Sequence, residues 1–222
     1  MVLRPGHEPA FTLFVRPKDP DAEVWSGRRV GPELARERFG ADAAHERRAL
    51  DAELPALLDG VRRVHLPLAD TALQRQVMRA RTSLWRRNRT GATPPEGFID
   101  ARVTVGEDRI RKDDASLASL RRAIDLTGHA HDAVQRSVRP GMYEFEVEAQ
   151  LEYEFRRGGG GGPGYGSIVG GGANATILHY VDNDDVLRDG ELLLIDAGAE
   201  FDLHSADLTR TFPIGGTFTA AQ

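Results

Sequence analysis

The chain has 222 residues, of which 40% are hydrophobic and 28% charged, so it can bury a core in one large domain or two small ones. A formal net charge of −5 argues against a nucleic-acid-binding protein, and the absence of cysteine excludes disulfides, thiolate metal sites and a cysteine nucleophile. No apolar run reaches the roughly 18 residues of a membrane span, and the first residues lack the apolar segment of a secretory signal. We therefore expect a cytoplasmic protein without a membrane partner.

The first part of the chain has the pattern of a small α/β domain. We expect strands at residues 10–15, 23–25 and 61–66, and helices over 32–59 (in two pieces divided near Gly40) and 71–89. The last of these helices carries six arginines with no acidic residue between them: Arg75, Arg79, Arg81, Arg86, Arg87 and Arg89. We interpret them as the solvated face of a helix, and expect no nucleic-acid partner.

The second part reads as helices followed by strands, which indicates an α+β class. A long helix begins at Asp113-Asp114 and ends at Pro140-Gly141, with an apolar stripe at alternating spacings of three and four: Leu117, Leu120, Ile124, Thr127, His131, Val134 and Val138. On this stripe His131 is interpreted as a core histidine. A second helix is expected over 146–157, followed by strands at 165–169, 176–180, 191–197 and 207–214.

A glycine-rich segment joins the helices to the strands. Ten of the 24 glycines lie between Gly158 and Gly172, and three of them satisfy G-x-G-x-x-G. A helix precedes this motif and a strand follows it, which is the reverse of a dinucleotide-binding fold, and no Gly-Lys-Ser/Thr is present. We therefore expect a flexible link into a strand, and no phosphate site.

Two aspartates carry the strongest chemical signal. Asp196 ends an apolar strand, where a carboxylate is costly unless it is compensated. If a hairpin turns between Phe201 and Asp202, then Asp196 and Asp207 face each other with Cβ atoms roughly 4.5–5.5 Å apart. A bound metal would relieve their repulsion, and bridging carboxylates suit a two-metal site. The alternative is a pair of aspartates near a turn that are hydrogen-bonded to the backbone.

Several motifs in one order resemble a known family. They are Leu120–Asp125, Arg139–Glu144, Ile177-Leu178-His179-Tyr180, Arg188–Gly198 and Ala206–Pro213. Together they closely resemble the Xaa-Pro aminopeptidases (aminopeptidase P) of the pita-bread metallopeptidase fold. The resemblance implies an α+β chain, with a creatinase-type N-terminal α/β domain over residues 1–105 and the first half of a pita-bread catalytic domain over residues 106–222.

The resemblance also implies the site. Asp196 would be a bidentate metal ligand, Asp207 would bridge two divalent ions, with manganese expected, and His179 would lie beside the scissile bond. The substrate would be a peptide with proline at its second position, and the protein would be a homo-oligomer. One histidine and two glutamates would complete the ligand set from a second half after Gln222, and the N-terminal domain would be clipped at its start. We therefore expect the 222 residues alone to be inactive.

Three other interpretations remain open. A prolidase that cleaves only Xaa-Pro dipeptides would share both aspartates. A creatinase-type enzyme is metal-free and lacks the two aspartate ligands, so Asp196 and Asp207 argue against it. The chain could also be a non-catalytic fragment or interaction module that keeps the family fold without the site.

Overall fold

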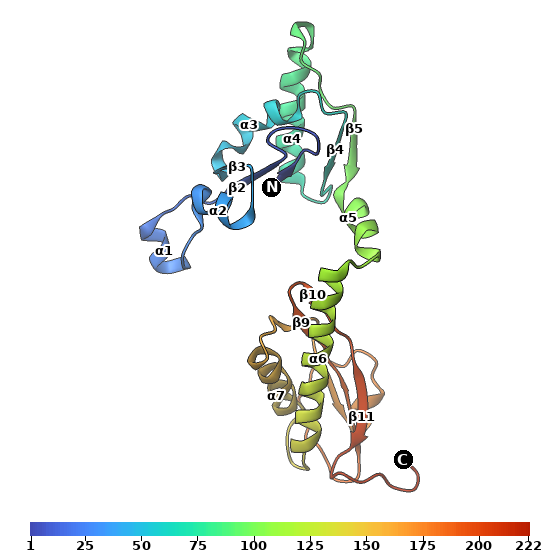
Figure 1. Cartoon of the computed structure of the whole chain (residues 1–222). Coiled ribbons are helices and arrows are strands. Elements are labelled where there is room, and N and C mark those ends of the chain that lie inside the picture. Colours follow the sequence, from blue (N-terminus) through green and yellow to red (C-terminus); the bar gives the residue numbers. More distant parts are fainter. The chain divides into compact units, whose positions relative to one another are not determined.

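The computed structural model describes all of residues 1–222, and the chain divides into two compact units, Met1–Ile110 and Arg111–Gln222 (Figure 1). Each unit has its own hydrophobic core. No helix of the structure combines the length and the apolar character needed to cross a membrane.

The first unit is an α/β unit. Its strands are β1 (Val2–Leu3), β2 (Phe11–Val15), β3 (Ala43–Glu46), β4 (Arg63–Leu66) and β5 (Gly97–Asp100); its helices are α1 (Pro20–Ser26), α2 (Gly31–Phe39), α3 (Leu50–Leu58), α4 (Thr71–Arg86) and α5 (Ala101–Ile110), with 3₁₀ turns η1 (Arg47–Ala49) and η2 (Asn88–Thr90). Strand β2 pairs antiparallel with β1 and parallel with β3, and β4 pairs parallel with β5. The core gathers side chains of α3, α4 and β4 with Ala92: Leu54, Leu58, Leu66, Val77, Ala80, Leu84 and Ala92.

Two expectations for this unit are wrong. Residues 23–25 belong to helix α1, because the Asp19 side chain caps the helix by accepting from the Ala22 amide at 3.1 Å and Pro20 opens its first turn. The helical stretch predicted over 32–59 does divide at Gly40, but strand β3 lies between its two pieces. This strand has the sequence Ala-Ala-His-Glu, which carries no β-branched residue to signal it.

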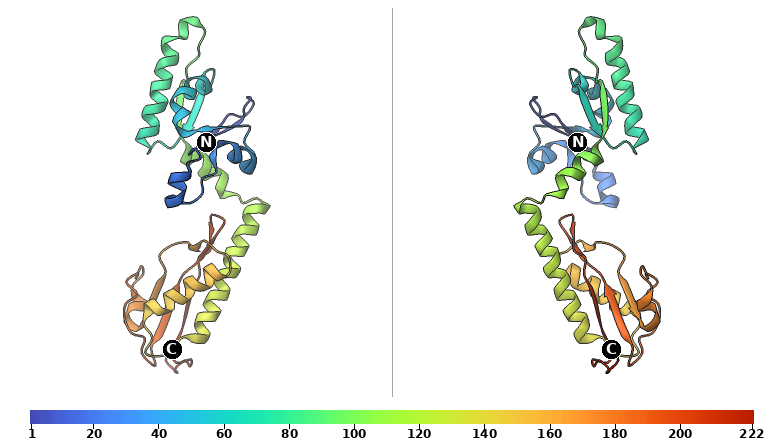
Figure 2. Two further views of the ribbon diagram at one scale, coloured as in Figure 1. Left: turned by 90° about the vertical axis from the view of Figure 1, so that its left-hand side faces the viewer. Right: turned by 90° about the vertical axis from the view of Figure 1, so that its right-hand side faces the viewer.

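The second unit packs two helices on short antiparallel sheets. Its elements are α6 (Asp114–Ser137), α7 (Glu144–Arg157), β6 (Gly162–Pro163), β7 (Ile168–Gly171), the 3₁₀ helix η3 (Gly172–Thr176), β8 (Leu192–Asp196), β9 (Ala199–Phe201), β10 (His204–Ser205) and β11 (Thr209–Pro213). One sheet has the order β11-β8-β7 and the other β10-β9-β6. Figure 2 shows α6 and α7 together beside these strands.

The core of the second unit lies between the two helices and the sheets. Helix α7 contributes Val147, Leu151 and Phe155, all fully buried, as its periodicity predicts. The stripe of α6 is confirmed at Thr127, His131 and Val134, whereas Ile124 is 53% exposed. The structural class predicted from the sequence, α+β with an α/β first part, agrees with this architecture.

Candidate metal centre

Asp196 and Asp207 lie at neighbouring strand ends of the second unit. Asp196 is the last residue of β8 and is half-buried, and Asp207 is exposed two residues before β11. Thr209, not Asp207, pairs with Asp196. Side chains alternate between faces along a strand, so Asp207 is the diagonal neighbour of Asp196 on one face. The predicted direct opposition is therefore wrong by two residues.

The turn explains the shift in register. Phe201 pairs with His204, so the turn residues are Asp202 and Leu203, with φ angles of 48° and 64°. Two left-handed residues form the tight hairpin turn whose twist matches that of the strands. Aspartate is common in such turns, but leucine is unusual in that conformation, so the residue pattern does not single out Asp202 and Leu203 as the turn.

A tyrosine hydroxyl joins the two carboxylates. The Tyr165 hydroxyl donates to Oδ1 of Asp196 at 2.5 Å, and it lies 3.3 Å from Oδ1 of Asp207. Burial, together with the two nearby carboxylates, raises the pKa of Tyr165 above its ordinary value, so its phenol keeps its proton. The sequence pattern predicts Tyr165 only as the start of a strand and does not reveal this role, because the contact spans 31 residues.

The glycine-rich segment positions Tyr165. Strand β6 pairs with β9, and the amides of Gly161 and Gly164 donate to the carbonyls of Glu200 and Gly198 at 2.9 and 2.8 Å. A Cβ on Gly164 would lie 2.5 Å from the Ser205 hydroxyl and 2.7 Å from the Ser205 Cβ, so the packing of this side chain needs glycine there. The expectation of a flexible link is wrong: these backbone pairs fix the segment against the strand that follows Asp196.

Two polar residues of α6 fix the backbone just beyond Asp196. The Thr127 hydroxyl accepts from the Ala199 amide at 2.9 Å, and His131 Nε2 donates to the Ala197 carbonyl at 3.1 Å. Both side chains are buried, and burial lowers the pKa of His131, so the imidazole is neutral. His131 is therefore a core histidine, as predicted, and it helps to position Asp196.

Gly198 gives a stability prediction for this segment. A Cβ there would lie 1.8 Å from the Ala206 carbonyl oxygen, so Gly198→Ala must push the two strands apart. We expect it to lower the free energy of unfolding by at least about 2 kcal/mol. Gly128→Ala is the matched control: it has open space within helix α6, and we expect it to stabilise the protein by up to about 1 kcal/mol. Urea unfolding of the three proteins tests this, and equal stabilities would contradict it.

The two carboxylates suit a divalent cation. Neither is part of an ion pair, although two converging anions repel each other. Carboxylate oxygens are the ligands that hard divalent ions such as manganese and magnesium prefer. The structure contains no cluster of three or more acidic, histidine or cysteine side chains that could hold a metal. The residues present thus fit a metal as two of its ligands, and a complete site needs others.

His179 lies in the loop between η3 and β8. It is exposed, and no hydrogen bond or ion pair joins it to Asp196 or Asp207. It lines an open hollow of about 470 Å³ together with Asn174, Ile177, Tyr180, Val181, Asp182, Asp184 and Asp185. The strand predicted over 176–180 is wrong, because this stretch is the end of η3 and a loop.

Tyr180, next to His179, gives a pH prediction. Burial and a 2.7 Å hydrogen bond to Glu144 raise the pKa of Tyr180 to about 12, whereas an unfolded tyrosine ionises near pH 10. Its contribution to stability is therefore complete below pH 10 and is lost between about pH 10 and 12. We expect Tyr180→Phe to flatten the fall in the free energy of unfolding over this range, and Tyr153→Phe, at an exposed site, to leave it unchanged. Identical slopes in all three proteins would contradict the prediction.

A helix pair packed on a short antiparallel sheet that presents two aspartates is the architecture expected for half of a pita-bread metallopeptidase domain. Residues 118–222 match the model of metallopeptidase family M24, and residues 1–65 match the model of the aminopeptidase P N-terminal domain. The second unit thus matches part of metallopeptidase family M24, and the first unit matches the N-terminal domain of aminopeptidase P.

Individual relatives agree with this assignment. The chain is 40% identical to the Xaa-Pro aminopeptidase of Escherichia coli K12 and 34% identical to that of Haemophilus influenzae, over 95% of its own length and 48% and 46% of theirs. Pseudomonas aeruginosa aminopeptidase PepP has a TM-score of 0.89 at 40% identity, and zinc-substituted E. coli aminopeptidase P in complex with product has a TM-score of 0.88 at 40% identity. In both, 95% of this chain and 48% of the solved chain are covered. The chain spans about half the length of the curated relatives it matches.

Proposed function

We propose that this chain contributes to a metal-dependent aminopeptidase that hydrolyses the bond between an N-terminal residue and a following proline. The observation that carries the proposal is the convergence of Asp196 and Asp207 on one tyrosine hydroxyl, within the segment that matches the M24 model. The relatives that share this segment bear the name Xaa-Pro aminopeptidase, and E. coli aminopeptidase P has been solved with the inhibitor Pro-Leu.

Asp196 and Asp207 would hold the metal ions, together with ligands from outside the residues described here. When bound, two divalent ions supply a nucleophilic hydroxide at neutral pH and polarise the scissile carbonyl. Manganese is our choice of metal, because carboxylate oxygens suit it and the family resemblance implies it. E. coli aminopeptidase P has been solved in a zinc-substituted form.

The chain's own residues supply orientation and proton control. Tyr165 keeps its proton and donates a hydrogen bond to Asp196, which fixes the rotation of that carboxylate. Neutral His131 holds the Ala197 carbonyl and keeps the backbone after Asp196 in place. His179, exposed beside an open hollow, is the residue we assign to the scissile bond, where it would hydrogen-bond the leaving proline nitrogen or the carbonyl oxygen.

The test is hydrolysis by the protein produced from its complete reading frame. With added manganese, we expect release of the first amino acid from an Xaa-Pro-Yaa tripeptide, and loss of this activity with a chelator. Faster cleavage of an Xaa-Pro dipeptide than of the tripeptide would instead indicate a prolidase. No hydrolysis of either peptide with manganese present would overturn the proposal and favour a non-catalytic module. Self-association and a cytoplasmic location stay predictions.

A further inference from the structure

Glu144 is a fully buried carboxylate outside the candidate metal centre. It is the first residue of α7 and is 0% exposed, yet it forms no ion pair. A buried carboxylate is costly unless hydrogen bonds replace its water. The N-terminus of helix α7 favours a negative charge at this position, but this offsets only part of the cost of burying the carboxylate. The remaining compensation must come from the groups around it.

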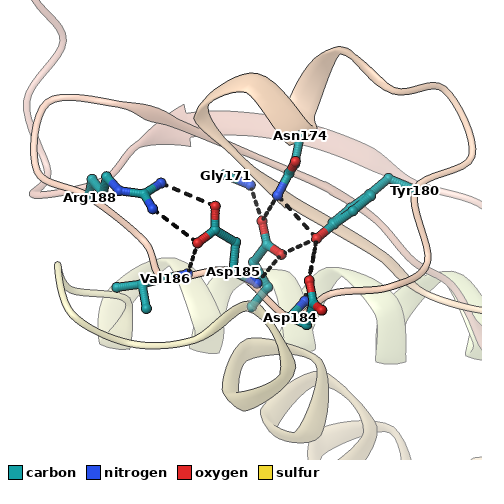
Figure 3. Close-up of polar contacts among 8 residues, drawn as sticks. Gly171, Asn174, Tyr180, Asp184, Asp185, Val186 and Arg188 are labelled. Carbon is teal, nitrogen blue, oxygen red and sulfur yellow. Dashed lines mark hydrogen bonds and ion pairs between the residues drawn. The ribbon is translucent and has the colours of Figure 1, made fainter.

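Four donors surround this carboxylate, two on each oxygen (Figure 3). Oε1 accepts from the Gly171 amide at 2.7 Å and from Asn174 Nδ2 at 3.1 Å. Oε2 accepts from the Tyr180 hydroxyl at 2.7 Å and from the Asp185 amide at 3.0 Å. All four donors belong to residues 171–185, so a single carboxylate accepts hydrogen bonds from both ends and from the middle of one segment.

The later part of this segment has no regular secondary structure to hold it. Residues 177–185 lie outside every helix and strand, and Ile177, Leu178 and His179 are exposed. A second buried anchor, Asn183, fixes the later half of the loop by accepting from the Val169 amide at 3.0 Å and donating to the Ser167 carbonyl at 2.9 Å. The half that carries His179 is held by Tyr180 and Asn174, and both bind Glu144.

We propose that Glu144 is a positioning residue for catalysis, which fixes His179 by holding Tyr180 and Asn174. The proposal rests on the proposed function, because it assigns Glu144 to the same reaction. Glutamine in its place keeps the size of the side chain but turns one acceptor oxygen into a donor. That donor would face two donors of the segment, so the loop must rearrange around His179.

The first test is a double-mutant cycle in the protein produced from its complete reading frame. Because small displacements of a reacting group are costly, we expect Glu144→Gln to lower kcat for an Xaa-Pro-Yaa tripeptide about 100-fold, with KM changed less than about threefold. In a His179→Ala background the same change should lower kcat less than about twofold, because its effect passes through His179. Equal losses in both backgrounds would overturn the proposal in favour of a purely structural role.

The matched control is Glu146→Gln. It makes the same substitution on the same turn of α7, where Glu146 accepts from the Tyr143 amide at 2.7 Å and forms no hydrogen bond with residues 171–185. We expect kcat to stay within about twofold of the wild type. A loss as large as that of Glu144→Gln would show that any change at this helix end lowers activity, and would also overturn the proposal.

Hydrogen exchange supplies a readout that does not depend on activity. We expect Glu144→Gln to speed amide exchange across residues 172–185 at least about tenfold relative to strands β8 and β11, and Glu146→Gln to leave it unchanged. Unchanged exchange in Glu144→Gln would contradict the anchor itself. An inactive wild type with the expected exchange would overturn the proposed function and the catalytic role, while the anchor of the segment would stand.

Discussion

Replacing Asp196 by asparagine is expected to lower kcat/KM for an Xaa-Pro-Yaa tripeptide at least about 1,000-fold in the protein produced from its complete reading frame. The amide removes a negative charge from the site where metal and developing oxyanion must be stabilised, and such electrostatic losses reach this size. It also leaves the Tyr165 hydroxyl without the carboxylate to which it donates at 2.5 Å. Steady-state rates over a range of manganese concentrations, with calorimetric titration of the metal, measure both effects.

Asp125→Asn is the control for this prediction. Asp125 is an exposed carboxylate on α6, in the same unit as Asp196, and we expect its loss to leave both rate and manganese affinity within about twofold of the wild type. Circular dichroism must show that Asp196→Asn is folded. A folded Asp196→Asn protein with unchanged manganese affinity would show that Asp196 is not a metal ligand.

The sequence predicts the long, strongly periodic elements of the fold well. Helices α6 and α7 and strand β8 lie close to their predicted ranges, because their apolar spacing extends over several turns or a whole strand. The errors fall on short stretches whose conformation is decided by distant groups. Residues 176–180 have the β-branched and aromatic composition of a strand. In the structure, however, the Tyr180 hydroxyl donates a hydrogen bond to Glu144, which lies 36 residues earlier in the chain.

The candidate site is predicted in part. Asp196 stands out because it ends an apolar strand, Asp207 begins the next predicted strand, and the structure does bring the two carboxylates together. The register between them depends on a turn at Asp202 and Leu203, where leucine stands in place of the usual glycine. The role of Tyr165 depends on the pairing of Gly164 with Gly198, which no local pattern of residues reveals.

The chain of 222 residues, purified by itself, is expected to show no hydrolysis of Xaa-Pro peptides. Asp196 and Asp207 are two carboxylates without a third acidic or histidine ligand beside them, so water must fill the other coordination positions of a metal. Loss of groups that merely support metal ligands costs about 10- to 100-fold in affinity, and loss of the ligands themselves should cost more. We therefore expect manganese to bind at least about 100-fold more weakly than to E. coli Xaa-Pro aminopeptidase measured in parallel.

The same chain should also self-associate. Strand β11 lies at the edge of the order β11-β8-β7, so one side of its backbone has no strand partner in the structure. An unpaired strand edge is a template for pairing with a second chain. Light scattering should show dimers or larger species, and a strictly monomeric chain would contradict this part of the prediction. Proline-specific hydrolysis by the mass-verified chain would contradict the first part, because the missing metal ligands would then have to come from a second copy across the β11 edge or from another subunit.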